Sequence, residues 1–416
     1  MKKLLFLFLL VNSLFTNINS QWYIQNEIPT FLNSVKFINF NFGFILGSDG
    51  LILKTTDGGN NWLEIPSNTI NKLADIYFID ETRGWICGSN GTVLITSDGG
   101  ENWNNISTSI NTHFKSIFFL TEDYGWVAGD KAIYKTTNGG QNWEVNRMDT
   151  IFHYITFKDS LTGFVSGEKL QQQHVYGFID ITTDGGETWT TKFETNLGYL
   201  TSLIFVEDSI GYAVGENGAK VKSTDGGNSW FLITPSGIFI ENWESAFFIN
   251  RNVGWVAGGS GRLIDYTTDG GINWTRQLDF PSNAHSLYSI FFIDSITGWA
   301  VGVKPGGGEI LKTTNGGVTF IESENGNVIR DFKLSQNYPN PFNPSTKISW
   351  QSPAAGHQTI KVFDVLGNEI ATLVDEYKPA GSYEVEFNAA GLSSGIYFYK
   401  LTTGIYTDSK KMLLIR

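Results

Sequence analysis

Short runs of alternating hydrophobic and polar residues recur along the chain from Val35 to Phe320. Each repeat contains a Phe, an apolar residue two positions before it, and a Gly-aromatic-x-x-Gly segment that begins six positions after it. The phenylalanines are Phe37, Phe78, Phe119, Phe157, Phe205, Phe248 and Phe292. Because side chains alternate along a strand, the Phe and the apolar residue share one side of it. The pattern predicts one inner strand through the Phe and a second strand through the glycine segment.

A second motif, Thr/Ser-x-Asp/Asn-Gly-Gly-x-x-Trp, follows each glycine segment and predicts a tight turn between a third and a fourth strand. Its acidic or amide residues are Asp57, Asp98, Asn138, Asp184, Asp225, Asp269 and Asn315. The Gly pair supplies the positive φ angles of such a turn, and the Asp or Asn can bond its own backbone two residues on. The closing aromatic residues at 62, 103, 143, 189, 230, 274 and 320 are 41, 40, 46, 41, 44 and 46 residues apart by subtraction.

A repeat of this length built from four short strands is typical of a propeller blade rather than a helical solenoid. We therefore predict an all-β fold, with a seven-bladed β-propeller over residues 21–321. The segment Gln21 to Ile24 looks like a fourth strand that lacks the other three, and the seventh motif ends in Phe320 instead of Trp. We expect the strand of Trp22 to complete the seventh blade.

The turn motif resembles the Asp-box of bacterial neuraminidase-type repeats, S/T-x-D-x-G-x-x-W. That resemblance implies a structural signature at the blade periphery without catalysis. The repeats as a whole resemble the photosystem II assembly-factor family of propellers, with its Gly-Trp-x-x-Gly and Thr-x-Asp-Gly-Gly-x-x-Trp units. Only the fold is carried over, because the photosynthetic role depends on a basic face and this chain has a net charge of −12.

The start of the chain predicts export. Met1-Lys2-Lys3 and the apolar run Leu4 to Leu10 form a signal peptide over residues 1–20. No other segment is apolar enough to span a bilayer. An acidic chain does not favour nucleic acid as a partner. Cys87, the one cysteine, cannot form an internal disulfide and is expected to be a small core residue.

The composition changes after a polar linker, residues 322–331. A segment with three prolines, Gln336 to Thr346, precedes short alternating runs at 347–350, 359–364, 383–387, 395–401 and 410–415. This pattern predicts a small immunoglobulin-like β-sandwich over residues 332–416. The Leu334-to-Pro344 opening, the Gly395-to-Leu401 strand and the basic ending Lys410 to Arg416 closely resemble the type A C-terminal sorting domain of the type IX secretion system. The resemblance implies the type IX machinery as a partner, delivery through the periplasm to the surface of a Gram-negative bacterium or beyond, and removal of the tail.

Enzymatic chemistry finds little support in the residues. A sialidase needs three converging arginines, and of the seven in the chain only Arg262 is predicted near a central position. A pair of carboxylates could converge without a sequence signal, so a secreted carbohydrate-active hydrolase stays open as an alternative. The histidines show no metal-ligand spacing, and we expect neither a metal nor a cofactor. The favoured interpretation is a monomeric binding module for an extracellular protein or glycan.

Strand direction predicts where that module binds. The turn motifs mark one side of the disc, so the second-to-third connections and the starts of the inner strands share the other. Two of those connections carry extra residues, Lys169 to Val175 and Lys304 to Gly308. The tenth residue before each first glycine is varied and mostly polar: Asn33, Ala74, Lys115, His153, Thr201, Glu244 and Tyr288. We expect a ligand to contact Lys115, His153, Glu244 and Tyr288, with Asn33 as a further candidate; solvated strand entries are the alternative.

Overall fold

The computed structural model describes residues 22–106, 108–148, 150–171, 173–233, 241–259, 261–280, 285–317, 332–352, 356–378, 381–403 and 406–416. The predicted signal peptide, Phe320 and the predicted linker lie outside these residues. Within them the chain is all-β, as predicted, apart from one 3-10 turn, η1 (Ser89–Gly91). None of the described segments is a helix that is long and apolar enough to cross a membrane.

Seven four-stranded sheets lie between residues 23 and 313 and are numbered here by repeat. Sheet 1 consists of β2 (Leu32–Phe37), β3 (Gly43–Gly47), β4 (Ile52–Thr55) and β5 (Leu63–Glu64). Sheet 2 consists of β6 (Leu73–Phe78), β7 (Gly84–Gly88), β8 (Val93–Thr96) and β9 (Asn104–Asn105). Sheet 3 consists of β10 (Phe114–Phe119), β11 (Gly125–Gly129), β12 (Ala132–Thr136) and β13 (Glu144–Met148).

Sheet 4 consists of β14 (Ile151–Phe157), β15 (Gly163–Gln171), β16 (His174–Thr182) and β17 (Thr190–Thr195). Sheet 5 consists of β18 (Leu200–Phe205), β19 (Gly211–Gly215), β20 (Lys220–Ser223) and β21 (Phe231–Leu232). Sheet 6 consists of β22 (Trp243–Phe248), β23 (Gly254–Gly258), β24 (Arg262–Thr267) and β25 (Thr275–Phe280). Sheet 7 consists of β26 (Ser286–Phe292), β27 (Gly298–Lys304), β28 (Gly307–Thr313) and β1 (Tyr23–Ile28).

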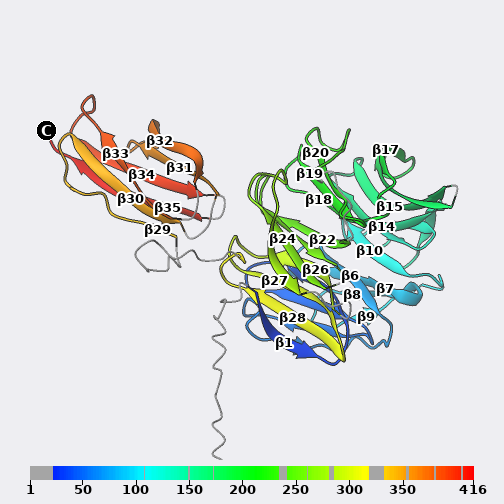
Figure 1. Cartoon of the computed structure of the whole chain (residues 1–416). Coiled ribbons are helices and arrows are strands. Elements are labelled where there is room, and N and C mark those ends of the chain that lie inside the picture. The colour runs from blue at the N-terminus through cyan, green and yellow to red at the C-terminus, as the bar shows by residue number, and fades with distance from the viewer. Residues whose placement is uncertain are drawn as a thin grey trace, which may run out of the picture.

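Sheet 7 is completed by the N-terminal strand, as the sequence predicts. β1 pairs antiparallel with β28, from Tyr23 opposite Lys312 to Ile28 opposite Gly308. Figure 1 shows the blue β1 beside the yellow β28 although almost 300 residues separate them in the chain. Trp22, just before β1, is only 2% exposed and packs edge-on against Phe292 of sheet 7, with ring centroids 5.7 Å apart. The other six phenylalanines of the repeat meet their own sheet's motif Trp in the same edge-on way.

Aromatic contacts also join each sheet to the next. The aromatic residue after each first glycine packs against the repeat Phe of the following sheet, as Trp85 does on Phe119 at 3.7 Å between centroids. The series closes on itself, because Trp299 of sheet 7 stacks on Phe37 of sheet 1 at 4.4 Å. Offset and edge-on aromatic pairs stabilise beyond the area that they bury. The repeated aromatic residues therefore hold neighbouring sheets together as well as filling each sheet's core.

Both glycines of the Gly-aromatic-x-x-Gly segment are explained by close approach. A Cβ atom at Gly43 would lie 2.7 Å from the ring of Phe37, and the other six first glycines meet their own Phe in the same way. A Cβ atom at Gly47 would lie 2.6 Å from the carbonyl oxygen of Phe31 at the start of the inner strand. Only glycine lets the first two strands approach this closely at both ends.

The Asp-box is held by hydrogen bonds that differ in one respect from the prediction. In the first copy Asp57 accepts from the backbone N–H of Asn61, four residues on, at 2.9 Å, rather than two residues on. The hydroxyl of Thr55 donates to Asp57 and accepts from the N–H of Gly59. Gly58 and Gly59 have φ of 68° and 70°, as expected. Four residues separate the Asp from the Trp, so a hydrogen bond from the Asp to the residue four positions on closes the whole turn. Among the described copies, Asn315 is the one that accepts from the backbone N–H two residues on, that of Gly317.

These bonds predict an acid-sensitive fold. Hydrogen bonds from Asn61, Asn102 and Thr188 lower the pKa of Asp57, Asp98 and Asp184 to about 2. An unfolded Asp titrates near pH ~4, so the unfolded chain binds more protons between these values and stability falls as the pH falls from about 4 to about 2. Thermal unfolding followed across this range should show the loss. The variant Asp57→Asn/Asp98→Asn/Asp184→Asn, which imitates the natural Asn138 copy, should show a flatter pH dependence; an equally steep curve would contradict the assignment.

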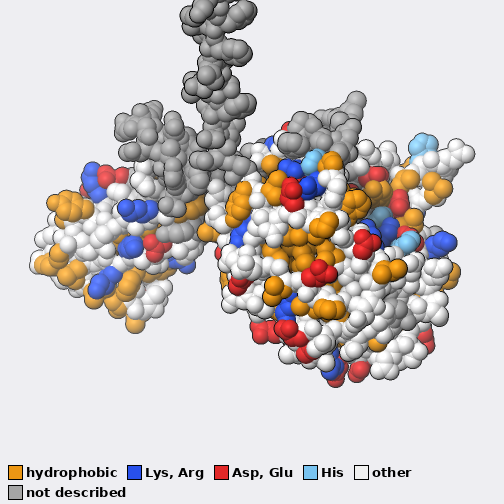
Figure 2. Space-filling model, turned by 90° about the horizontal axis from the view of Figure 1, so that it is seen from below, with side chains coloured by type: hydrophobic (Ala, Val, Ile, Leu, Met, Phe, Trp, Pro, Cys, Tyr) orange, Lys and Arg blue, Asp and Glu red, His pale blue; other side chains and the backbone are white. Residues whose placement is uncertain are grey.

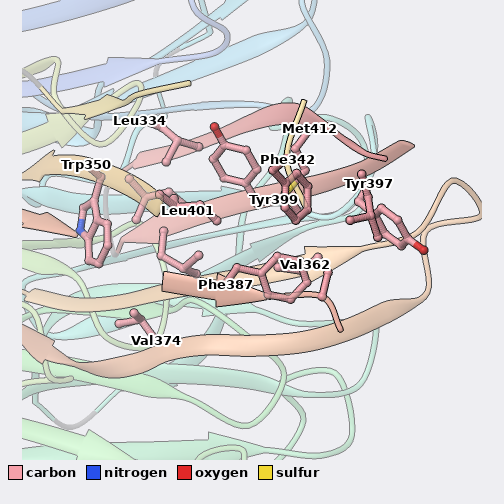
Figure 3. Close-up of a cluster of buried hydrophobic side chains, with 14 residues drawn as sticks. Leu334, Phe342, Trp350, Val362, Val374, Phe387, Tyr397, Tyr399, Leu401 and Met412 are labelled. Atoms are coloured by element: carbon pink, nitrogen blue, oxygen red, sulfur yellow. The ribbon is translucent and has the colours of Figure 1, made fainter. Parts of the chain in front are cut away.

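Residues 333–414 form two further sheets that share one core. One contains β29 (Lys333–Leu334), β30 (Ser345–Ser352) and β33 (Gly381–Asn388). The other contains β32 (Glu369–Lys378), β31 (Gly356–Phe363), β34 (Gly395–Thr403) and β35 (Tyr406–Leu414), in that order. Trp350, Tyr399 and Leu401 meet between the sheets (Figure 3). The predicted strands are present, but the prediction missed β32, because its apolar and charged residues do not alternate strictly and two register shifts interrupt its pairing.

The proline-containing segment covers an edge of this domain. β35 is the last strand of its sheet, and both backbone groups of Phe342 form hydrogen bonds with the end of this strand. The Phe342 N–H donates to the Leu413 carbonyl at 2.9 Å, and the Ile415 N–H donates to the Phe342 carbonyl at 3.0 Å. The Gln336 amide donates to the carbonyl of Lys411 at 2.7 Å. Prolines cannot continue a ladder, so the segment protects the edge without extending the sheet.

Candidate functional site

The predicted ligand-contacting residues lie at a β-bulge near the start of each inner strand, which changes the direction of their side chains. In each of the seven sheets the pairing of the first strand with the second shifts at the tenth residue before the first glycine. In sheet 3, for example, Phe114 pairs with Gly129 and Ser116 with Ala128, which leaves Lys115 without a partner in the ladder. A bulge turns one side chain out of the strand's alternation. The residue types at this position are therefore free to vary while the core positions below stay apolar.

Two of the bulge residues join a cluster of ionisable groups through direct contacts. The Lys115 ammonium lies 3.1 Å from a carboxylate oxygen of Asp130. The Nε2 atom of His153 lies 3.4 Å from Glu168, and the His153 ring stacks on Tyr199 with centroids 4.8 Å apart and planes at 16°. Burial lowers the pKa of His153, which favours the neutral ring, although Glu168 acts in the opposite direction.

Glu244 is a member of this cluster whose carboxylate has no direct partner among the described residues. Burial and the nearby Glu216 carboxylate raise its pKa, while Lys72 and Lys115 act against that rise. Within the described residues its carboxylate forms no hydrogen bond and no ion pair. Glu244 also contributes to raising the pKa of Tyr288, after burial, so these two groups lie within electrostatic reach of each other. Electrostatic interactions thus link Lys115 to His153 and to Glu244, and Glu244 to Tyr288.

Asn33 does not take part in this cluster. Its amide donates to the carbonyl of Leu73 in the next sheet at 3.0 Å. Thr201, at the same position of sheet 5, donates to the carbonyl of Trp243 in sheet 6 at 2.7 Å. At these two positions the bulge residue ties neighbouring sheets together.

The sequence analysis missed five ionisable members of the cluster: Lys72, Asp130, Glu168, Tyr199 and Glu216. Lys72 and Tyr199 lie two residues before the bulge, and the three carboxylates lie five residues after the first glycine. An alignment of the repeats at the fifth residue after the first glycine would have shown these three acidic residues. The stacking of Tyr199 on His153 could not be read from the sequence, since it joins different sheets.

The two predicted long loops are instead extended hairpins, which corrects the expectation of irregular connections. β15 and β16 stay paired as far as Gln171 opposite His174, and β27 and β28 as far as Lys304 opposite Gly307. The extra residues therefore lengthen the paired strands. Leu170 and Val175 face each other in the first hairpin and are both exposed.

The described arginines of the sheets do not converge. Arg262, predicted near the centre, contacts Glu309 of the neighbouring sheet, whose side chain is fully buried. Arg147 pairs with Asp180, and Arg276 with Asp265 and Glu241. Each of the three is paired with at least one carboxylate, so no three-arginine site for a carboxylate substrate forms from them.

The described residues also offer neither an exposed thiol nor a metal-binding cluster. Cys87 is fully buried in the core between sheets 2 and 3, as predicted, and burial raises the pKa of its thiol. Among the described residues no three His, Cys, Asp or Glu side chains are grouped to hold a metal ion. Figure 2 shows acidic and basic side chains interspersed over one side of the molecule, without a broad basic patch there.

Two family models match the chain. Residues 60–199 match the photosynthesis system II assembly factor YCF48, and residues 336–415 match the secretion system C-terminal sorting domain. The photosystem II assembly lipoprotein Ycf48 of Nostoc sp. is 28% identical over 186 residues, which are 44% of this chain and 51% of that protein. The matched part therefore spans about half the length of this relative.

Solved structures share the fold. The structure of YCF48 bound to D1 peptide has a TM-score of 0.56 and 22% identity, covering 71% of this chain and 97% of that one. The GH74 enzyme of Niastella koreensis has a TM-score of 0.58 and 12% identity, covering 94% and 74%. At these identities the likeness concerns the fold alone. The chain thus combines a β-propeller similar to the YCF48 photosystem II assembly factors with a C-terminal sorting domain that indicates export through the type IX secretion system to the cell surface or outside.

Proposed function

We propose that the mature protein is a monomeric, exported seven-bladed propeller that acts as a binding module. Its domains are a signal peptide at 1–20, the propeller at 21–321, a linker at 322–331 and an immunoglobulin-like sorting domain at 332–416. Seven four-stranded sheets and the contact of Trp299 with Phe37 support the closed ring. Export leaves the propeller outside the cell, so its ligand is an extracellular protein or glycan.

The observation that carries this proposal is the half-buried Glu244 carboxylate, which has no direct partner within the described residues. A charge held away from water without a partner is unfavourable, and a bound cationic group would relieve that cost. Lys115 is already paired with Asp130, and a neutral His153 does not cancel the charge of Glu168. Lys72, which has an electrostatic interaction with Glu244, offsets one more negative charge. The four carboxylates, Asp130, Glu168, Glu216 and Glu244, outnumber the two lysines, so the cluster keeps an excess of negative charge. A polypeptide segment with a basic side chain fits this site, and the peptide complex of YCF48 is a structural precedent for peptide binding by this fold.

Alanine substitutions test the site. Arrays of basic and acidic peptides and of glycans, probed with the full chain, should identify a ligand. Alanine at Lys115, His153, Glu244 or Tyr288 is then expected to weaken binding, by about ten-fold for a residue that contacts the ligand at the centre of the site. Alanine at Asp57, in the opposite turns, should lower only the melting temperature. The reverse pattern would refute this assignment of the face.

A secreted glycoside hydrolase is the second candidate, favoured by one feature of the same cluster. Burial raises the pKa of both Glu216 and Glu244, and the two carboxylates repel each other. A general acid in a glycosidase needs a raised pKa of this kind. Release of reducing sugar from common polysaccharides, lost in Glu244→Gln, would support a hydrolase; no release from any of them together with ligand capture on the arrays would support the binding module.

A further inference from the structure

The two sheets of the sorting domain differ in the faces that they turn away from their shared core. The outward residues of β30 and β33 are all polar: Lys347, Ser349, Gln351, Ser382, Glu384, Glu386 and Asn388. The outward face of the four-stranded sheet instead carries Ile396, Phe398 and Leu413, which are 41%, 38% and 37% exposed. Large apolar side chains gathered on one face of a small domain mark an interaction surface.

The strand register places these residues side by side. Ile396 of β34 lies opposite Leu413 of β35. In the next outward row, Phe398 lies between Phe363 of β31 and Lys411 of β35. Directly opposite residues on one face of a sheet have Cβ atoms about 4.5–5.5 Å apart, so the four apolar side chains form one continuous patch. We call this patch and its neighbouring lysines the β34 face.

The β34 face also carries excess positive charge. Lys400 of β34 lies directly opposite Lys361 of β31, an arrangement that costs stability because like charges repel. Lys361 is paired with Glu369 at 2.9 Å. Lys400 and Lys411 form no ion pair with any residue that the structure describes. The polar sheet differs here as well, since its Lys347 is paired with Glu384 at 2.7 Å.

We propose that the β34 face is the docking surface by which the sorting domain binds a protein of the export pathway. The partner surface has apolar groups opposite Phe398 and Ile396 and carboxylates opposite Lys400 and Lys411. Charge complementarity of this kind sets the orientation and the rate of association, while the apolar patch supplies affinity. A protein partner fits better than a lipid surface, because the apolar side chains lie half-buried in a regular sheet. Membrane-interface anchors instead bury a broad apolar face in the headgroup region.

The test compares matched variants of the full chain in the exporting bacterium. The double variant Ile396→Thr/Phe398→Thr removes two side chains of the apolar patch, and Thr is chosen because it favours strands. We expect the exported fraction of the propeller to fall by about ten-fold, as for the loss of central interface anchors, with folded precursor accumulating in the periplasm. The control, Lys347→Thr/Glu384→Thr, alters the outward face of the other sheet and should be exported as the parent chain is. Normal export of the folded Ile396→Thr/Phe398→Thr chain would overturn the proposal.

A second variant keeps the proposal testable if the first fails to fold. Lys400→Glu/Lys411→Glu changes only exposed side chains outside the core and should also reduce export; full export of this chain would overturn the proposed charge complementarity. Sedimentation of the full chain with phosphatidylglycerol vesicles distinguishes a lipid partner. We expect no vesicle binding, and binding that is lost in Ile396→Thr/Phe398→Thr would overturn the protein assignment.

Discussion

Deleting residues 21–26 is expected to lower the melting temperature of the mature propeller by about 10 °C or more. Trp22 is 2% exposed, and losing a buried Trp costs about 3–5 kcal/mol. For a domain of 150–250 residues each kcal/mol corresponds to about 2–4 °C, and the longer propeller lies at or below the lower end of this range, so the Trp alone accounts for up to roughly 6–10 °C. The deletion also removes the pairing of Tyr23 and Ile24 with β28 and exposes that strand's edge.

β1 also joins the last sheet to the first. The Gln25 side-chain oxygen accepts from the indole N–H of Trp299 in sheet 7 at 3.2 Å and from that of Trp62 in sheet 1 at 3.4 Å. Its amide donates to the carbonyl of Gly59 at 2.6 Å. Losing β1 therefore weakens the boundary between sheets 7 and 1 as well as sheet 7 itself.

Strand complementation provides the control for this deletion. A synthetic peptide with the sequence of residues 21–28 should raise the melting temperature of the shortened protein, and the same peptide with Trp22→Ala should raise it much less. Tyr23→Thr, at a position that is 44% exposed, should leave the full protein nearly unchanged. An unaltered melting temperature after the deletion would show that β1 is not needed for closure.

Removing the sorting domain is expected to abolish delivery outside the cell while leaving a folded propeller in the periplasm. The core of the domain contains only residues from 334 onward, so its loss exposes no core of the sheets before it. Phe332 packs against the core of sheets 6 and 7, so the cut should fall after it, at residues 333–416. Separate cores joined by a polar segment are typical of domains that fold independently.

Cell fractionation followed by limited proteolysis measures this outcome. The shortened chain should appear as a protease-resistant propeller in the periplasmic fraction, with none in the medium or at the surface. Its melting temperature should match that of the propeller within the full chain. Surface delivery of the shortened chain would contradict a sorting role, and a shortened chain that is degraded would contradict independent folding.

The repeat pattern predicted most of the architecture because its determinants are local. The Phe, the two glycines and the Asp-box each act within one repeat, so their spacing reveals the four strands of each sheet. Trp22 was predicted to complete sheet 7 because the seventh repeat lacked its Trp. The face holding the bulge residues was predicted from strand direction alone, and electrostatic interactions link four of the predicted residues. The sorting domain was recognised because its motifs occur in order along the chain.

Tertiary structure decided what depends on neighbours distant in sequence. No local pattern distinguishes Asn33, which ties sheet 1 to sheet 2, from Lys115, which faces Asp130. The bulge itself depends on how the inner strand pairs with the next one, and β32 depends on pairing with β31 across two register shifts. Alternation along a single strand shows which residues share a side of it; only the packing of separate strands determines whether that side meets another sheet, as Tyr399 does, or faces outward unpartnered, as Phe398 does.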